Sequence, residues 1–135
     1  MCLCVYVASD RELRTDEWVK ASPAFYLESI TTRDEVVRSV FTLRHIYYAG
    51  SHEQCGCGFE KDYEEIDDIE LRQSNYTGLS ERISDVVSSG ERIEIFTCWE
   101  GQQNRKPEIF GTKFLGQLTE PSFNFRTLEF LEITQ

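Results

Sequence analysis

The sequence predicts an α+β fold in which a mixed, mostly antiparallel sheet of five or six strands carries two helices on one face. Several short segments alternate apolar and polar residues or are rich in β-branched and aromatic residues, as strands are. Two other segments have apolar residues at helical spacing. The chain has 135 residues, of which 40% are hydrophobic, so we expect residues 1–135 to form a single α+β domain with its own core.

The predicted strands are short and separated by polar connections. Residues 3–8 (LCVYVA) are apolar on both faces, which is typical of a central strand covered on both sides. Residues 92–99 (RIEIFTCW) alternate between two faces and form the clearest strand of the chain. The remaining strand segments are residues 24–30, 45–49, 109–118, which two glycines interrupt, and 125–133.

Two segments predict helices. In the first, Thr32 and Glu35 have the spacing of a capping box, and an apolar stripe follows at Val36, Val37, Val40 and Phe41. The second is expected from about Leu79 to Ser88, with Gly90 as a left-handed cap after its last turn.

The charge of the chain excludes some classes of partner. The formal net charge is −10, and residues 60–70 (EKDYEEIDDIE) contain seven acidic residues and one lysine, so this stretch supplies −6 of it. Because nucleic acids and anionic membranes attract basic surfaces, we expect no nucleic acid and no membrane among the partners. The acidic stretch lacks the residue order of a calcium loop, so we expect a solvated loop or a short polar helix.

The first residues do not resemble a targeting segment. The apolar run that begins the chain has no basic residues before it and stops at Ser9-Asp10-Arg11. We therefore expect a cytoplasmic protein, in which the five cysteines are kept reduced.

The segment HEQCGCGF, residues 52–59, is the strongest candidate for a functional site. Gly56 separates Cys55 from Cys57 and allows both sulfurs to turn toward one point, and His52 could add a nitrogen ligand. A fourth ligand could come from Cys2, Cys4 or Cys98. Soft sulfur and nitrogen ligands suit zinc, so the sequence predicts a possible zinc site at His52, Cys55 and Cys57, although the C-x-C spacing is shorter than in most zinc motifs.

Two other interpretations of the same residues stay open. Cys55 and Cys57 could form a strained, easily reduced disulfide and serve as a thiol redox regulator, although the acidic residues that follow would raise a thiol pKa. Alternatively, the cysteines are small apolar residues and the glycines serve a tight turn, which is the expected role of the strand cysteines Cys2, Cys4 and Cys98.

Four short stretches give the chain a resemblance to known sequences. They are MCLCVY at 1–6, PAFY at 23–26, YYAGSHEQCGCGF at 47–59 and CWEG at 98–101. In these stretches the chain resembles a group of small bacterial proteins of uncharacterised function. The resemblance implies one constellation of residues: Cys2, Cys4, Ser51, His52, Cys55, Cys57, Cys98 and Trp99.

The sequence favours a small binding or accessory protein over an enzyme. The nucleophile motif G-x-S-x-G, the phosphate-binding loop and the dinucleotide fingerprint are all missing, and no catalytic residues are assigned. The partner would be an unknown protein or small molecule. As an alternative, the protein could be a non-catalytic interaction module with an aromatic groove lined by Tyr47, Tyr48, Phe59 and Trp99.

Overall fold

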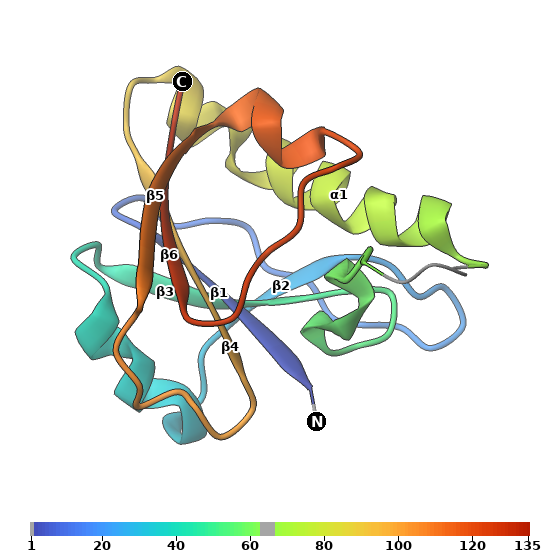
Figure 1. The fold of residues 1–135 in the computed structure, drawn as a ribbon, viewed down its shortest axis with the longest axis horizontal. Coiled ribbons are helices and arrows are strands. Elements are labelled where there is room, and N and C mark those ends of the chain that lie inside the picture. The colour runs from blue at the N-terminus through green and yellow to red at the C-terminus, as the bar shows by residue number, and fades with distance from the viewer. Residues whose placement is uncertain (1, 63–66) are drawn as a thin grey trace.

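A computed structural model describes residues 2–62 and 67–135 of the chain. Six strands form one sheet in the order β2-β3-β1-β4-β6-β5 (Figure 1). The strands are β1 (Leu3–Ser9), β2 (Tyr26–Ser29), β3 (His45–Gly50), β4 (Ile93–Trp99), β5 (Ile109–Phe114) and β6 (Glu129–Thr134). Neighbouring strands are antiparallel except β5 and β6, which are parallel, so the predicted mixed, mostly antiparallel α+β sheet is confirmed.

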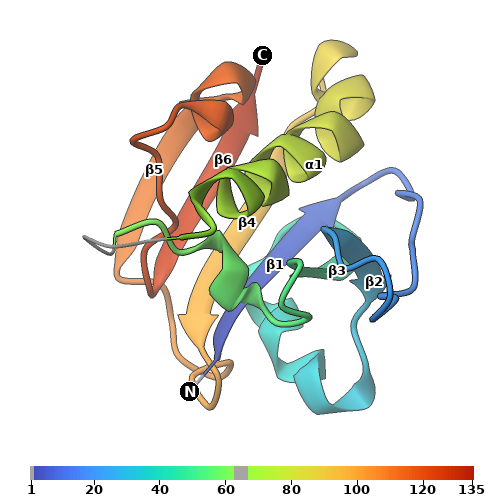
Figure 2. The ribbon, with the colours of Figure 1, turned by 90° about the vertical axis from the view of Figure 1, so that its right-hand side faces the viewer.

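The helical segments cover both faces of this sheet. They are α1 (Ile69–Ser88) and the 3-10 helices η1 (Thr32–Val40), η2 (Gly56–Phe59) and η3 (Leu115–Thr119). Helix α1 crosses one face and packs with η2 and η3 (Figure 2). The segment η1 lies against the opposite face, where Val37 packs with Tyr6 and Phe96. The two helices were predicted on one face, but in the structure α1 and η1 lie on opposite faces of the sheet.

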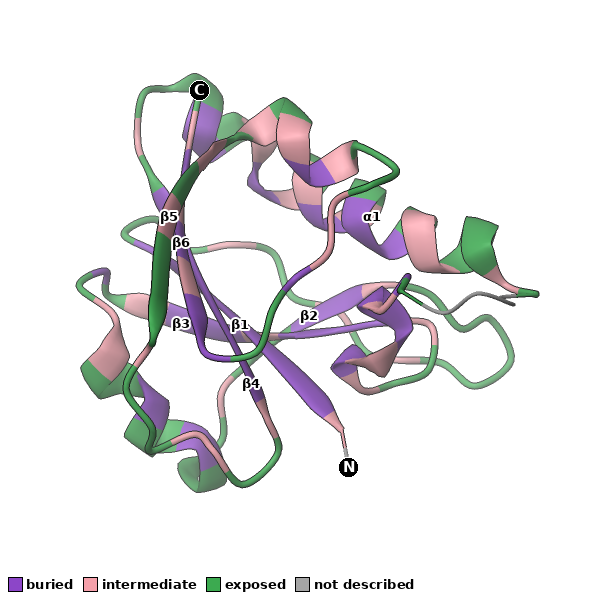
Figure 3. Ribbon diagram, in the orientation of Figure 1, coloured by how far each residue is buried: buried purple, intermediate pink, exposed green. Residues whose placement is uncertain are grey.

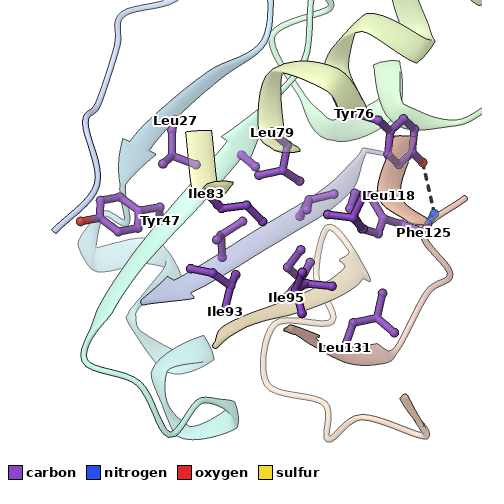
Figure 4. Close-up of a cluster of buried hydrophobic side chains, with 14 of the residues drawn as sticks. Leu27, Tyr47, Tyr76, Leu79, Ile83, Ile93, Ile95, Leu118, Phe125 and Leu131 are labelled. Atoms are coloured by element: carbon purple, nitrogen blue, oxygen red, sulfur yellow. Dashed lines mark hydrogen bonds between the residues drawn. The ribbon is translucent and has the colours of Figure 1, made fainter. Parts of the chain in front are cut away.

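Strand β1 is the centre of the fold. All seven of its residues are buried, and the central, doubly covered position predicted for it is confirmed (Figure 3). Leu3, Val5 and Val7 contribute to the core under α1, whereas Cys4 and Tyr6 contribute to the core under η1. Figure 4 shows the first of these cores, in which Leu79 and Ile83 of α1 face the strands.

Helix α1 begins at Ile69, well before the predicted start near Leu79. Its buried side chains, Asn75, Tyr76, Leu79, Ile83, Val86 and Val87, follow helical spacing, but the first turns carry mostly polar residues. Gly78 lies within the helix, where Phe25 packs so closely that an added Cβ would lie 2.9 Å from Cδ2 of its ring. Residues 63–66, part of the predicted acidic loop, lie outside the described residues.

Of the two predicted helix ends, the structure contains the glycine cap at Gly90 but not the capping box at Thr32. Gly90 follows α1 with φ at +90°, and this confirms the left-handed cap. The capping box at Thr32 does not form, because Thr31 is the residue before the helix and the Glu35 carboxylate binds Arg38 instead. The segment is a 3-10 helix in which Val37 is buried and Val36 is 48% exposed.

The last two strands are shorter than the sequence predicts. Of residues 109–118, only Ile109–Phe114 pair in the sheet, and Leu115–Thr119 form η3, which packs on α1. The strand predicted at 125–133 begins at Glu129, since Leu128 has a left-handed backbone with φ at +56°.

Candidate metal site

The segment 51–60 packs where β3 ends and β1 begins, at one end of the sheet (Figure 2). Within it, η2 approaches the backbone of β1 so closely that a Cβ on Gly56 would lie 2.4 Å from the carbonyl oxygen of Leu3. Glycine is therefore required at this position, and the contact brings Cys55 and Cys57 beside the first residues of the chain.

Ser51 organises the turn from within. Its hydroxyl donates a hydrogen bond to the carbonyl of Cys55 and accepts from the backbone N–H groups of Glu53 and Gly58, each at 3.1 Å. A Cβ on Gly58 would lie 2.1 Å from the Ser51 oxygen, so this glycine makes room for the hydroxyl. Ser51 is fully buried and has a structural role.

Asn75 joins this segment to helix α1. Its side-chain oxygen accepts from the backbone N–H of His52 at 3.1 Å, and its nitrogen donates to the carbonyl of Gly58 at 2.9 Å. The same nitrogen lies 2.9 Å from Nδ1 of His52. Because an amide nitrogen only donates, Nδ1 must be the acceptor, and His52 is the neutral tautomer with its proton on Nε2.

The Nε2 proton of His52 points to Asp68, which lies at 3.1 Å. Asp68 also accepts from Nε of Arg72 at 2.8 Å, and this bond, together with the one from His52, lowers the pKa of the Asp68 carboxyl. Arg72 in turn donates to the carbonyls of Cys57 and Glu60, each at 2.9 Å. Residues at the start of α1 thus bind His52, before η2, as well as the backbone within and after η2.

Three cysteine sulfurs converge beside this network. The Sγ atoms of Cys2, Cys55 and Cys57 all lie within 4.8 Å of one another, and each residue is half-buried. The backbone N–H of Leu3 donates to Sγ of Cys57 at 3.2 Å, so this sulfur is held against the start of β1. Among the described residues, no histidine, aspartate, glutamate or further cysteine joins the group.

Burial controls the protonation of the Cys55 thiol. It raises the pKa of the Cys55 thiol to about 12, although a backbone hydrogen bond from Cys57 acts in the opposite direction. Cys55 is therefore a neutral thiol near pH 7 when no metal is bound. A metal ion would have to displace its proton, which makes binding dependent on pH.

His52 lies outside the sulfur cluster. It belongs to a separate group with Glu53 and Asp68, and both of its ring nitrogens take part in hydrogen bonds. The predicted ligand set of His52, Cys55 and Cys57 is therefore divided in the structure: the two cysteines lie with Cys2, and His52 fastens the turn to α1.

The other two cysteines belong to the core. Cys4 and Cys98 are opposite each other in the β1–β4 register and are buried among apolar residues, so the prediction that they act as small apolar residues is confirmed. Burial raises the pKa of Cys4 to about 11 and that of Cys98 to about 12. Neither joins the cluster of the other three sulfurs.

The four aromatic residues considered for a groove do not lie on one surface. Tyr47, Phe59 and Trp99 belong to the core under α1, and Tyr47 and Phe59 are buried there. Tyr48 lies on the other face, with its ring edge-on to that of Tyr6. These rings stabilise the fold on both sides of the sheet.

Sequence reasoning missed the residues of α1 and its N-cap that position the turn. Asp68, Arg72 and Asn75 follow the helical i, i+4 and i, i+3 spacing, which places them on one side of the helix, but nothing in the sequence pairs them with residues 51–60. Cys2 was one of three cysteines that could have approached Cys55 and Cys57, and only the path of β1 selects it.

None of the helices in residues 2–62 and 67–135 is both long and apolar enough to cross a membrane.

Comparisons with known proteins add no family to this description. No model of a protein family matches the chain, and no curated protein and no solved structure matches it.

Proposed function

We propose that the protein is a small binding or accessory protein that holds a soft metal ion, zinc in the first instance, between Cys2, Cys55 and Cys57. The observation that carries this proposal is the convergence of three sulfurs within 4.8 Å of one another from two distant parts of the chain. The proposal places the protein in the cytoplasm, where reduced thiols remain available to a metal.

The distances between the three sulfurs support their binding to one and the same metal ion. Zinc–sulfur bonds of about 2.3 Å hold tetrahedral ligands about 3.8 Å apart, so sulfurs already within 4.8 Å need only a small adjustment. Three thiolates leave one of the four zinc positions for water or for a group from a bound partner. His52 is a less suitable fourth ligand, because zinc would have to replace one of its two ring hydrogen bonds.

The surrounding hydrogen bonds support a preformed site. Ser51, Asn75 and Arg72 fix the backbone of the turn at Cys55, Gly58 and Cys57, so the thiols are held close together before any ion arrives. Less conformational entropy is then lost when the ion binds.

Metal content provides the test. Protein purified anaerobically and loaded with zinc should retain about one ion per chain after desalting, by elemental analysis, and the Cys55→Ser/Cys57→Ser double variant should retain none. The matched control is Cys98→Ala, which removes a buried thiol outside the cluster and should retain the ion. Equal zinc in the double variant, or none in the wild type, would overturn the proposal.

The proximity of the same sulfurs supports a second candidate, a thiol redox regulator that uses Cys55 and Cys57. The raised pKa of Cys55 opposes it, because the thiolate is the reactive species in disulfide exchange. Thiol titration across glutathione ratios distinguishes the two: a redox regulator shows a transition between dithiol and disulfide at cytosolic potentials, whereas the metal site shows none.

A further inference from the structure

Strand β5 combines an open sheet edge with the most exposed aromatic side chains of the described residues. It is the last strand of the sheet order, and no described strand pairs with its outer side (Figure 1). Phe110 is 70% exposed and Phe114 is 61% exposed, and Figure 3 shows the strand as largely exposed along its length. Exposed apolar edges of this kind are rare in proteins that stay monomeric.

The opposite edge of the sheet is protected. Strand β2 has only four residues, and its Leu27 exchanges hydrogen bonds with Asp16: the backbone N–H of Asp16 donates to the carbonyl of Leu27, and the Leu27 N–H donates to the Asp16 carboxylate. Glu28 and Ser29 are exposed there. The two edges therefore differ, and only β5 presents an apolar surface for pairing.

The hydrogen bonds of β5 show which backbone groups are directed outward. In a parallel pair, alternate residues direct both N–H and C=O toward the neighbouring strand. The N–H of Ile109 donates to the carbonyl of Leu128, so Ile109, Gly111 and Lys113 face β6. The groups of Phe110, Thr112 and Phe114 then point away from the sheet, in agreement with the Phe114 N–H, which donates to the side chain of Gln117 at 2.8 Å.

The spacing of these three residues is symmetric. Phe110 and Phe114 lie two residues before and two residues after Thr112. If two copies of β5 pair antiparallel about a two-fold axis at Thr112, each Phe110 is opposite the partner's Phe114, and Thr112 is opposite its own copy. All three outward-facing residues then form hydrogen-bonded pairs, with the Gln117 side chain giving up the Phe114 N–H. An isologous interface requires this kind of self-complementary pattern.

We infer that β5 is a self-association surface, through which two copies of this chain join their sheets edge to edge about Thr112. The rings of Phe110 and Phe114 pair across the axis on the face that also carries Phe130 and Phe41. The centroid of the Phe130 ring lies 6.1 Å from that of Phe110 and 6.0 Å from that of Phe41. Aromatic pairs directly opposite each other are among the stabilising contacts of antiparallel sheets.

The available area indicates a weak dimer. With about 200 Å² for each phenylalanine, the exposed parts of the two rings amount to about 260 Å² per chain and about 500 Å² for the pair. This is about a third of the 1,600 Å² that standard interfaces bury, and the paired backbones and flanking residues add to it. We therefore expect dissociation constants in the micromolar range, with tighter association at higher salt because each copy carries a net charge of −10.

Sedimentation equilibrium over a range of protein concentrations tests the inference. The wild type should show a reversible monomer–dimer equilibrium, and Phe110→Ser/Phe114→Ser should raise the dissociation constant at least tenfold. A wild type that stays monomeric at its highest soluble concentration would overturn the inference. So would a double variant that dimerises as tightly as the wild type.

Cross-linking tests the register and keeps the inference falsifiable if the double variant fails to fold. Hydrogen-bonded partners in an antiparallel pair have Cα atoms about 5.5 Å apart, within disulfide reach. Thr112→Cys should therefore form an intermolecular disulfide under mild oxidation. Lys113→Cys is the matched control, because Lys113 lies on the other face of the strand and is opposite Gly111 of the second copy. Cross-linking of Thr112→Cys that does not exceed that of Lys113→Cys and of the wild type would refute the register and with it the inference.

Discussion

Asn75 joins residues 51–60 to helix α1, and its replacement by alanine should destabilise the protein. The residue is fully buried in α1. Its amide binds the N–H and Nδ1 of His52 and the carbonyl of Gly58, so one side chain provides three hydrogen bonds between the helix and the turn. Asn75→Ala removes all three hydrogen bonds and leaves the N–H and Nδ1 of His52 and the carbonyl of Gly58 without this partner.

The size of this loss of stability follows from the groups that lose their hydrogen bond to Asn75. A buried polar group that loses its partner costs about 1–3 kcal/mol, and two backbone groups and one ring nitrogen are affected. Alanine has a better helix propensity than asparagine, by about 0.5 kcal/mol, which offsets a small part of the loss. With all three groups at the low end of this range, and with the propensity gain subtracted, we expect Asn75→Ala to lower the free energy of unfolding by at least about 2.5 kcal/mol.

Urea denaturation monitored by circular dichroism measures this change. Ser74→Ala is the matched control: Ser74 lies on the same turn of α1, but its hydroxyl donates within the helix, to the carbonyl of Leu71, and to no other group in the described part of the chain. Its loss should therefore stay within about 0.5 kcal/mol. A loss below about 1 kcal/mol for Asn75→Ala would show that the amide does not hold the turn.

Three further predictions concern other parts of the fold. Burial raises the Cys98 pKa from 9.0 to about 12, so the folded state keeps a proton that the unfolded state loses. Cys98 by itself should therefore lower the free energy of unfolding by about 1.4 kcal/mol per pH unit above pH 9, and urea denaturation between pH 8 and 11 should show a fall that is shallower by this amount for Cys98→Ala. Gly58→Ala should lower the melting temperature by several degrees in calorimetry, since its Cβ would lie 2.1 Å from the Ser51 hydroxyl. Gly116→Ala should leave the melting temperature nearly unchanged, since its Cβ would meet no atom of the described residues within 4 Å apart from its chain neighbours. The buried carboxylate of Glu94 accepts from two backbone N–H groups and a hydroxyl between η1 and β3, so Glu94→Leu should cost about 2–4 kcal/mol in urea denaturation, and a neutral effect would contradict the role assigned to these bonds.

Local sequence patterns were sufficient to predict the strands and helix segments that bury an apolar face. The alternation in residues 92–99 and the apolar run in residues 3–8 predict strands that the structure contains as β4 and β1. Gly90 was identifiable as a cap because a positive φ favours glycine after a helix. The beginning of α1 was not identifiable, because its first turns are held by polar contacts of Asp68 and Arg72 with each other and with the turn before the helix.

The sequence alone determined the fold class, most of the strands and the location of the cysteine-rich turn, because hydrophobic periodicity and glycine placement act over a few residues. Only the tertiary structure decided which side chains meet. The path of β1 brings Cys2 to Cys55 and Cys57, while the packing of α1 draws His52 to Asn75 and Asp68. Contacts between segments so distant along the chain depend on strand order and helix position, and no local pattern encodes them.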